Sequence, residues 1–385
     1  MKRMATISDV ADAAGVSRQT VSNVLNTPTI VRPDTRQRVE EVIARLAYRP
    51  HASARRLRTR KSSTIGIRLD PMTDGISGSV LDRFLHALTE QAAERGLRIL
   101  IFTAAGPEDE IVQFKRLIDG ADVDAFVLTS TFHGDPRTEW LIENGHSFVT
   151  FGRPWGIDDM SDENHLWVDV DGSAGLRAAT EHALAAGARR VGYIGWPVGS
   201  GTGDDRRRGW QSALVASGVT DVALLESLQV AANDTVVEGG AAMLRLREQV
   251  PGLDAVVCAS DSLALGAMMN NPHALPVTGY DNTPVAAALG LSSVEQCLGD
   301  VAAGVLELLM AESAAGAAAG SGAGAGSGGA AGESSGGAAG ERSGDAAGEV
   351  AGDGVMGPQA DDPRHRLVIP RLVVREMVVP GWSPE

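Results

Sequence analysis

Three polar side chains near the amino terminus carry the donors and acceptors needed to read the edges of DNA bases. They belong to Arg18, Gln19 and Asn23. An arginine can donate two hydrogen bonds to O6 and N7 of guanine, and a glutamine or asparagine can pair with N6 and N7 of adenine. Each well-made pair contributes about 1–3 kcal/mol of discrimination between bases. These residues suit sequence-specific recognition of double-stranded DNA if a helix presents them to the major groove.

The sequence around these residues predicts the helices that such recognition requires. Residues 6–9, Thr-Ile-Ser-Asp, have the pattern of a capping box and predict a first helix that ends near Gly15. Ser17 suits the N-cap of a second helix that ends at Asn26. Pro33 suits the first position of a third helix. The apolar residues that would share one face of this third helix are Val39, Val42, Ile43 and Leu46.

The spacing of Ala11, Gly15 and Val21 is typical of a helix-turn-helix. The motif needs a small residue where its helices touch, a turn residue that tolerates positive φ, and an apolar residue that faces the first helix. Its second helix enters the major groove, whereas groups at helix amino termini are well placed for phosphates. The DNA contacts expected from this unit are Thr6, Ser17, Arg18, Gln19, Thr20 and Asn23.

Charge is distributed unevenly along the chain. The 385 residues carry a net charge of -15, yet residues 1–61 hold 13 Lys and Arg against 5 Asp and Glu, a net +8. The remaining residues therefore carry a net charge of -23. This asymmetry indicates a basic module that meets phosphates and an acidic module with another task. The two cysteines, Cys258 and Cys297, are too far apart in sequence to suggest a zinc site or a disulfide framework.

From about residue 64 the pattern predicts short strands that alternate with amphipathic helices. Strands are expected at residues 64–69, 98–103, 125–129, 147–151, 190–194, 255–259 and 277–280. This alternation indicates βαβ units, right-handed crossovers and parallel sheets. The number of units favours two doubly wound lobes with a cleft between them.

Residues 314–357 consist mainly of Gly, Ala and Ser and contain almost no large apolar side chains. Such a composition cannot offset the entropy of ordering, and Gly recurs too often for the Ala runs to hold a helix. We therefore expect a disordered insert. Residues 366–374, RLVIPRLVV, then predict a single returning strand. Because the entropy of loop closure grows only logarithmically with length, the insert should barely disturb the fold.

The segment TISDVADAAGVSRQTVSNVLN and the basic stretch after it resemble the LacI/GalR family of bacterial repressors, and the resemblance continues through most of the chain. It implies that residues 51–58 form a hinge helix that orders only on DNA. Leu57 would then wedge into a minor-groove step, while arginines such as Arg56 neutralise phosphates. Ala54, Arg56 and Leu57 complete the predicted DNA contacts.

The acidic region resembles the effector domain of the same family, which is similar to periplasmic sugar-binding proteins with two Rossmann-like lobes. The segments that carry the resemblance are FGRP at 151–154, VDVDG at 168–172, residues 181–195, RRRGW at 206–210, ASDSLALGA at 259–267, GYDN at 279–282 and LSSVEQ at 291–296. The resemblance implies that Arg206, Asp281 and residue 260 face the ligand, although Ser260 stands where family members commonly carry Asn. A guanidinium and a carboxylate suit pairs of sugar hydroxyls.

Two further features concern the ligand site. Asp171 is either a ligand residue or the N-cap of the helix at residues 172–186, and we favour the cap. The family often has an aromatic residue after the first strand, whereas residues 70–80 contain none, so a stacking surface must come from elsewhere. The tryptophans available for stacking are Trp155, Trp167, Trp196 and Trp210, of which Trp210 joins the expected effector site. Plain packing is the alternative for each of them.

The predicted fold class is an all-α helix-turn-helix domain joined to an α/β periplasmic-binding-protein-like domain of two Rossmann-like lobes with parallel sheets. The expected boundaries are 1–50 for the DNA-binding domain, 51–61 for the hinge, 62–312 with 366–378 for effector binding and dimerisation, 313–360 for the insert and 379–385 for a tail. The Gly-rich residues 199–203 lack the spacing of a phosphate-binding loop and are interpreted as a mobile cleft loop.

The predicted function is that of a cytoplasmic homodimeric repressor of carbohydrate-utilisation genes, released from a pseudo-palindromic operator by a sugar. No catalytic or metal-binding motif is found, so neither an enzyme nor a cofactor is expected, and no membrane segment is expected. The alternatives are a purine- or nucleoside-responsive repressor of the same architecture and a constitutive architectural DNA binder. A solute receptor without a DNA role is opposed by residues 1–61. The end of the chain lacks heptads, which favours a dimer over a tetramer.

Overall fold

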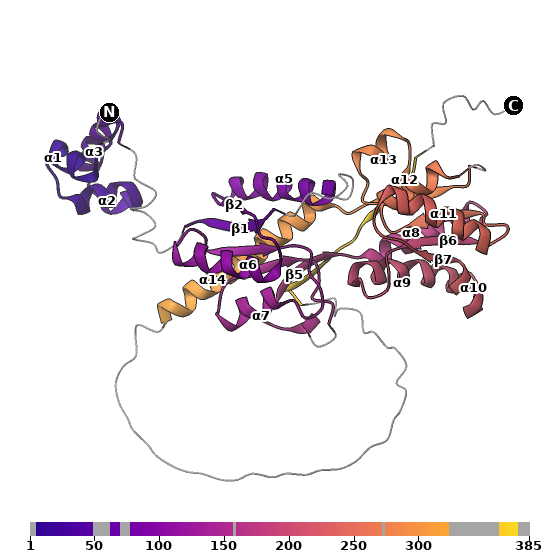
Figure 1. Cartoon of the computed structure of the whole chain (residues 1–385). Coiled ribbons are helices and arrows are strands. Elements are labelled where there is room, and N and C mark those ends of the chain that lie inside the picture. The colour runs from indigo at the N-terminus through magenta and orange to yellow at the C-terminus, as the bar shows by residue number, and fades with distance from the viewer. Residues whose placement is uncertain are drawn as a thin grey trace, which may run out of the picture. The chain divides into compact units, whose positions relative to one another are not determined.

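The computed structural model describes residues 5–48, 62–69, 78–156, 159–271, 274–322 and 362–375. They include a helical unit, residues 5–48, and a larger α/β unit, and each is described by itself (Figure 1). Within the described part of the chain, no helix is long and apolar enough to cross a membrane.

The helical unit consists of three α-helices and one short 3-10 helix. They are α1 (Ile7–Ala14), α2 (Arg18–Asn26), η1 (Pro28–Ile30) and α3 (Pro33–Leu46). The predicted capping box is confirmed, because Asp9 N donates to Thr6 Oγ1 (3.3 Å) and Thr6 N donates to Asp9 Oδ2 (2.7 Å). Gly15 ends α1 in the left-handed conformation, at φ 63°. The predicted ends of α1 and α2 and the predicted start of α3 are thus confirmed.

A small apolar core holds these three helices together. Its buried members are Val10, Ala11, Ala14, Val21, Val24, Val39, Val42 and Tyr48. Val10, Val21 and Val39, one from each helix, are fully buried. Ile43 and Leu46, which were also predicted for the inner face of α3, are partly buried against this core. The inner faces of the helices therefore follow the apolar periodicity of the sequence.

Lobe 1 of the α/β unit is built on a parallel six-stranded sheet in the order β11-β5-β4-β3-β1-β2. Its strands are β1 (Thr64–Arg68), β2 (Arg98–Phe102), β3 (Ala125–Leu128), β4 (Phe148–Phe151), β5 (Leu166–Val170) and β11 (His365–Val368). Its helices are α5 (Gly78–Glu94), α6 (Pro107–Asp119), α7 (Pro136–Glu143), η2 (Asp159–Ser161) and α14 (Leu298–Gly322). Val127 of β3 packs in one cluster with side chains of α5 and α14. The preceding residue, Phe126, contacts Phe114 of α6 instead, with ring centroids 4.4 Å apart. Because successive strand residues point to opposite faces, helices cover both faces of this sheet.

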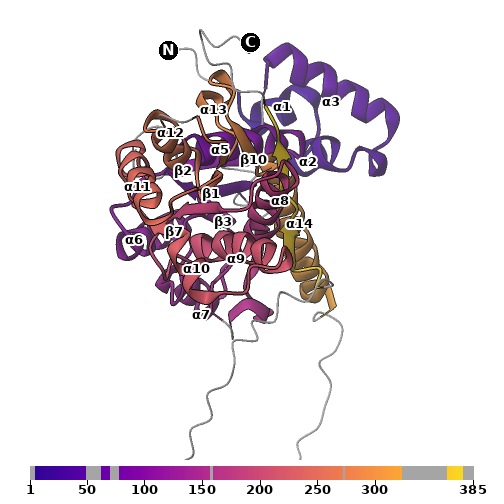
Figure 2. The same ribbon diagram turned by 90° about the vertical axis from the view of Figure 1, so that its right-hand side faces the viewer.

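Lobe 2 is built on a second six-stranded sheet in the order β12-β10-β9-β8-β6-β7. Its strands are β6 (Val191–Gly195), β7 (Gln229–Ala231), β8 (Ala255–Cys258), β9 (Val277–Tyr280), β10 (Ser292–Glu295) and β12 (Arg371–Val373), of which β12 is antiparallel to its neighbour. Its helices are α8 (Gly172–Ala185), α9 (Gly201–Ala216), α10 (Val222–Ser227), α11 (Val236–Gln249), α12 (Asp261–Met269) and α13 (Pro284–Ala288). The pairs α8–α9 and α11–α12 make close helix–helix contacts (Figure 2).

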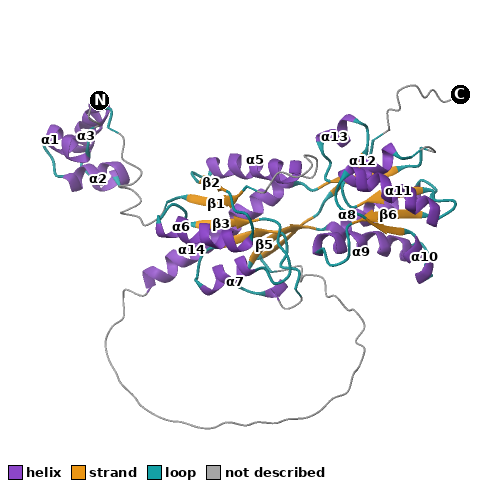
Figure 3. Ribbon diagram, viewed as in Figure 1, coloured by secondary structure: helices purple, strands orange, loops and turns teal. Residues whose placement is uncertain are grey.

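The two sheets repeat one topology, with strands ordered second, first, third, fourth and fifth along each lobe. Figure 3 shows the strands of the two lobes in orange and the helices around them in purple. The order reverses beside β1 in lobe 1 and beside β6 in lobe 2. In open α/β sheets, ligands bind outside the carboxyl ends of the strands near such a reversal. The chain passes between the lobes after β5, after β10 and between β11 and β12. The predicted two-lobed architecture is confirmed.

The single returning strand predicted at residues 366–374 is wrong in one respect. Two strands are present, separated by Ile369 and Pro370. β11 runs parallel to β5 in lobe 1, and β12 runs antiparallel to β10 in lobe 2. Proline has no backbone N–H to donate, which ends the first ladder and lets the chain cross to the other lobe. Three strands that the sequence analysis did not assign, β5, β7 and β10, complete the sheets.

The predicted start of the disordered insert is also wrong. Helix α14 continues through residue 322 and so includes residues 313–322, which were assigned to the insert. Its earlier turns are anchored in the lobe 1 core by Val301, Val305 and Leu309. Extending an existing helix needs no new nucleus, and alanine has the highest helix propensity, so the Ala-rich continuation tolerates its glycines. Residues 323–360 of the predicted insert lie outside the described residues.

Candidate functional site

Helix α2 presents polar side chains at an exposed amino-terminal end. Ser17 Oγ caps the helix by accepting the N–H of Thr20 at 3.1 Å, and it lies 2.9 Å from Thr20 Oγ1. Arg18 and Gln19 are exposed in the first turn. Gln19 Nε2 donates to Asn23 Oδ1 at 3.0 Å, so the two amides share one side of the helix. This arrangement suits insertion of the start of α2 into a major groove.

The remaining predicted DNA contacts have different outcomes. Thr6 is exposed at the start of α1, where its hydroxyl donates to Asp9 Oδ2 at 2.8 Å. Its N-terminal position leaves it suited to a phosphate. Ala54, Arg56 and Leu57 of the predicted hinge lie outside the described residues.

A cavity of about 320 Å³ lies between the two lobes, at the carboxyl ends of their strands. Lobe 1 contributes Val80, Leu81, Ser130, Thr131, Phe151, Gly152, Asp169 and Val170. Lobe 2 contributes Gly172, Trp196, Thr202, Arg206, Asp234, Tyr280, Asp281 and Gln296. A volume of this size with a few convergent polar groups is typical of small-molecule sites.

Arg206, on α9, is the central side chain of the lobe 2 wall. Its guanidinium lies 3.7 Å from the ring centroid of Tyr280 and 5.1 Å from that of Trp196. Nη1 donates to the carbonyl of Ala259 and lies 3.6 Å from Asp281 Oδ1. Only 5% of the residue is exposed. Two aromatic faces and the carboxyl group of Asp281 therefore hold the guanidinium in a fixed orientation.

Three buried polar atoms of this wall have no hydrogen-bond partner among the described residues. They are Arg206 Nε, the Tyr280 hydroxyl and Trp196 Nε1. A buried polar group left unsatisfied costs about 1–3 kcal/mol, so such groups in a native fold need an explanation. All three can donate, and a small molecule with several oxygen acceptors would satisfy them. Trp196 is also the one predicted stacking candidate that lines the cavity.

Asp281 follows β9 in an unusual conformation and environment. Its φ of 106° lies in a region that non-glycine residues rarely occupy, and such strain concentrates at functional sites. Gln296 Nε2 donates to its Oδ1 at 2.6 Å. Burial raises the pKa of Asp281 to about 8, against the opposing effect of Arg206. At neutral pH the carboxyl therefore keeps its proton and can donate as well as accept a hydrogen bond.

Ion pairs connect the lobes beside the cavity. Arg153, at the end of β4 in lobe 1, pairs with Asp169 at 2.7 Å and with Asp205 of α9 in lobe 2 at 2.5 Å. Arg83 of α5 donates to the Glu295 carboxylate of β10 at 2.9 and 3.1 Å. It also donates to the backbone carbonyl of Asp281 at 3.1 Å. A change in the angle between the lobes would alter these contacts.

Ser260 does not line the cavity, so direct contact with a ligand is not supported. It is fully buried as the N-cap of α12, where its Oγ accepts the N–H of Leu263 at 3.2 Å and donates to the Asp234 carboxylate. The hydroxyl of Ser260 is thus already engaged within the protein. Asp234 lines the cavity instead, and Ser260 supports it from behind.

Two other expected effector residues are placed elsewhere. Trp210 is fully buried, stacks on Tyr193 with ring centroids 5.4 Å apart, and donates from Nε1 to the Val191 carbonyl at 3.0 Å. Contact of Trp210 with an effector is therefore not supported, because the indole fills the space between α9 and β6. Asp171 is confirmed as the cap of α8, since its carboxylate accepts the N–H of Ala174 at 2.8 Å, and it is not among the residues that line the cavity. The Gly-rich residues 199–203 form the Ser200 cap and first turn of α9.

Several cavity residues were not singled out by the sequence analysis. They are Thr202, Asp234, Tyr280, Gln296 and Asp169. Tyr280 and Gln296 stand inside the GYDN and LSSVEQ segments, and Asp169 stands inside VDVDG. A position at or just beyond the carboxyl end of a parallel strand was the signal that could have found all of them except Thr202, which lies in the first turn of α9.

Removal of the Tyr280 hydroxyl should have opposite effects on the free and the ligand-bound protein. In Tyr280→Phe, the free energy of unfolding of the ligand-free protein should rise by about 1 kcal/mol, because an unsatisfied buried hydroxyl disappears. The affinity for a ligand that accepts from this hydroxyl should fall roughly tenfold. Urea unfolding and ligand titration of the same preparations measure both quantities. A loss of stability would show that the hydroxyl is satisfied in the free protein.

Both the helical unit and the α/β unit have matches among known proteins. Residues 6–51 match the family model of bacterial regulatory proteins of the lacI family, and residues 78–276 match that of periplasmic binding proteins and the sugar-binding domain of the LacI family. The HTH-type transcriptional regulator CelR of Thermobifida fusca is 32% identical over 311 residues, which cover 77% of this chain and 88% of CelR. A CelR–cellobiose complex superposes with a TM-score of 0.59 at 24% identity, over 97% of this chain and 99% of that one. The lac repressor dimer bound to operator superposes with a TM-score of 0.68 at 20% identity, over 98% and 100% of the two chains.

The two kinds of match have different weight. The solved structures are below 25% identity and show a shared fold, whereas the family models and CelR extend the likeness to the sequence over most of the chain. The first family model covers the helix-turn-helix, and the second covers most of the two-lobed α/β unit. The chain therefore belongs to the LacI family of bacterial transcriptional regulators.

Proposed function

We propose that this protein is a homodimeric cytoplasmic repressor that binds a pseudo-palindromic operator through α2 and releases it when a sugar occupies the interlobe cavity. The observation that carries the proposal is the lobe 2 wall, where three buried donors, Arg206 Nε among them, have no hydrogen-bond partner within the described part of the chain. A sugar supplies many hydroxyl oxygens and an apolar face that suits Trp196. The matched sugar-binding family model and the cellobiose complex support the same class of effector.

A ligand in this cavity touches both lobes, which gives it the means to regulate DNA binding. Such a ligand shifts the operator affinity only by its differential affinity for two arrangements of the lobes. The ion pairs Arg153–Asp205 and Arg83–Glu295 are contacts that such arrangements would not share. We assign the cavity to sensing and not to catalysis, because the matched family models and CelR are those of transcriptional regulators.

The effector is identified by thermal unfolding of the full chain with cellobiose, maltose, galactose, raffinose, adenosine and hypoxanthine at millimolar concentration. A ligand at 100 times its Kd adds about 2.7 kcal/mol of stability, which raises the Tm by several degrees. We expect one sugar to do so and Arg206→Ala to abolish the shift. A shift with adenosine or hypoxanthine instead would favour the purine-responsive alternative, and a sugar shift that survives Arg206→Ala would place the ligand elsewhere.

The DNA-binding half is tested by Arg18→Ala on a duplex selected from a random pool by the wild-type protein. Loss of one bidentate base contact should cost about 1–3 kcal/mol on this duplex, roughly 5- to 150-fold in Kd, with little change on a scrambled duplex. Arg36→Ala is the matched control, since Arg36 is a partly exposed arginine of α3 paired with Glu40. Equal losses on both duplexes would reassign Arg18 to a phosphate contact, and no preference of the wild type for any duplex would favour an architectural binder.

A further inference from the structure

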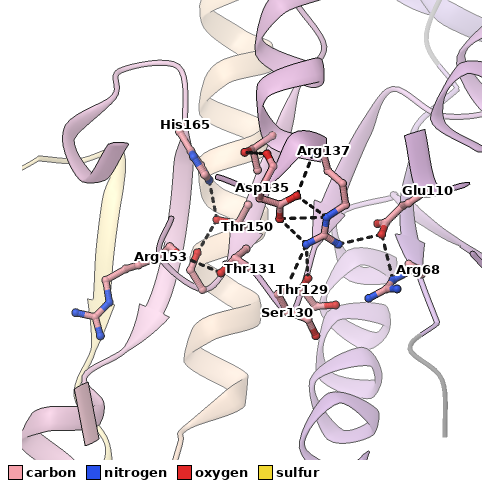
Figure 4. A network of polar contacts seen from close by, with 12 residues as sticks. Arg68, Glu110, Thr129, Ser130, Thr131, Asp135, Arg137, Thr150, Arg153 and His165 are labelled. Atoms are coloured by element: carbon pink, nitrogen blue, oxygen red, sulfur yellow. Dashed lines mark hydrogen bonds and ion pairs between the residues drawn. The ribbon is translucent and has the colours of Figure 1, made fainter. Parts of the chain in front are cut away.

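Lobe 1 holds a buried network of charged side chains behind the cavity wall (Figure 4). Arg137, in the first turn of α7, and Glu110 of α6 are each 1% exposed. Asp135, the N-cap of α7, is 5% exposed. Arg68, at the end of β1, joins them through a contact of 3.1 Å between its Nε and Glu110 Oε2. None of these four residues lines the cavity.

Arg137 makes most of the contacts of this network. Its Nε and Nη2 donate to the two oxygens of Asp135 at 2.9 and 2.6 Å. Its Nη1 donates to Glu110 Oε2 at 2.9 Å. The planar guanidinium is thus clamped between two carboxylates on different elements, and its rigid geometry determines where the remaining N–H groups point.

The remaining side-chain hydrogen bonds of Arg137 go to the backbone of residues 129–131, a segment here called the rim of the cavity. Its Nη2 donates to the carbonyls of Thr129 and Ser130 at 3.1 and 3.2 Å, just beyond β3. Ser130 has φ 56°, a left-handed conformation that the chain adopts at a cost and only where surrounding contacts hold it. Ser130 and Thr131 both line the cavity. Arg137 therefore holds the backbone of the segment that lines the cavity, although Arg137 itself does not line it.

Further contacts connect the rim to lobe 2. Thr131 Oγ1 donates to the Arg153 carbonyl at 2.8 Å. A Cβ on Gly152 would lie 2.4 Å from Thr131 Oγ1, which shows how closely the two segments approach. Arg153 in turn pairs with Asp205 of α9, the helix that carries Arg206. A continuous chain of contacts thus leads from Arg137 to the other wall of the cavity.

A buried cluster of four charges is a poor way to gain stability, because desolvation offsets the attraction and apolar residues of similar size often stabilise as well or better. What the cluster supplies and apolar side chains cannot is a set of directed donors to backbone carbonyls. We propose that Arg137 is a positioning residue for effector binding, which fixes the rim at residues 129–131 so that the lobe 1 wall matches the ligand. The proposal rests on the function proposed above for the cavity.

The test compares Arg137→Lys with Leu141→Ala in the full-length protein. Lysine keeps the positive charge, but its single ammonium group cannot span two carboxylates and two carbonyls at once. Leu141 is a fully buried residue of the same helix, one turn further on, so its replacement weakens α7 packing without touching the rim. The first readout is amide hydrogen exchange of peptides that cover residues 126–131 and 149–153, including the Gly152 N–H that donates to the Val168 carbonyl.

Arg137→Lys should accelerate exchange in these peptides at least tenfold and raise the Kd of the sugar found in the thermal panel by a similar factor. Leu141→Ala should lower the Tm while leaving both rim exchange and Kd near the wild-type values. Rim exchange that is unchanged, or equally accelerated in both variants, overturns the proposal.

The ligand readout separates the two proposals. Faster rim exchange with an unchanged Kd, in a cavity where Arg206→Ala abolishes binding, also overturns the positioning role. If the wild-type protein binds no sugar in the panel, the proposed function fails, and the exchange comparison still decides whether Arg137 holds the rim.

Discussion

Replacement of Gly209 by alanine should destabilise the protein by about 3 kcal/mol or more and abolish effector binding. Gly209 lies in α9 where this helix crosses α8, and a Cβ there would lie 2.0 Å from the Ser173 carbonyl oxygen. Backbone cannot yield as a flexible side chain can, so the helices must separate, and overpacking of this kind typically costs 1–3 kcal/mol and occasionally more. The direction of the stability change is informative, because a glycine-to-alanine replacement in an unobstructed helix stabilises it by up to about 1 kcal/mol.

Separation of these helices should reach the cavity directly. Arg206 and Asp205 lie within one turn of Gly209 on the same helix, so both the aromatic clamp and the interlobe ion pair would move. Urea unfolding measures the stability, and the sugar-induced Tm shift measures binding. Gly299→Ala is the control, because nothing lies within 4 Å of a Cβ at Gly299 and this variant should be neutral or slightly stabilised. If Gly209→Ala behaves like Gly299→Ala, the α8–α9 contact described here is wrong.

The contribution of Asp281 to the stability of the folded protein should fall as the pH rises from about 4 to 8, and Asp281→Asn should lack this contribution. Burial raises the pKa of Asp281 to about 8, against the effect of Arg206, whereas an unfolded aspartate has a pKa of about 3.9. In this window the folded chain holds a proton that the unfolded chain has released. The stabilisation is therefore complete below about pH 3.9 and is lost as the pH rises through about 8, by at most about 1.4 kcal/mol per pH unit.

Asparagine is a suitable replacement because it tolerates positive φ and keeps an oxygen for Gln296. Burial also raises the pKa of Asp169 and Asp261, and both groups are present in both proteins. Because Asp261 interacts electrostatically with Asp281, the difference between the two stability curves reports residue 281 together with its effect on Asp261. Asp254→Asn is the control. The N–H groups of Arg189 and Arg190 lower the pKa of Asp254, so its contribution is lost only at acid pH. Parallel curves for the wild-type protein and Asp281→Asn from pH 5 to 8 would contradict a protonated Asp281.

The helical unit and the two-lobed plan could be predicted from the sequence because their signals are local. The Thr6–Asp9 capping box, Gly15 and Ser17 set the ends of α1 and the start of α2 through contacts that span three or four residues. Most strands of the sheets follow from short apolar runs between helices. Such patterns act through backbone conformation and burial within one element, so they survive without knowledge of the partner.

The composition of the cavity was decided by the tertiary structure. Trp196 and Trp210 are the same residue type, and nothing in their composition distinguishes them. Trp196 nevertheless lines the cavity, whereas Trp210 is buried between α9 and β6. Tyr280, Asp234 and Gln296 come together from separate strand ends of lobe 2, and no spacing along the chain reports that proximity.

The sequence by itself determined most of the helices and strands, which module is basic and which residues α2 exposes. The tertiary structure decided which side chains meet across the lobes, how β11 and β12 divide between two sheets, and that α14 extends past residue 312. The physical reason is the range of the interactions. Capping, helix periodicity and strand alternation act over a few residues, whereas the contacts of Arg137, Arg153 and Arg206 join residues up to 75 positions apart, whose proximity exists only once the sheets have formed.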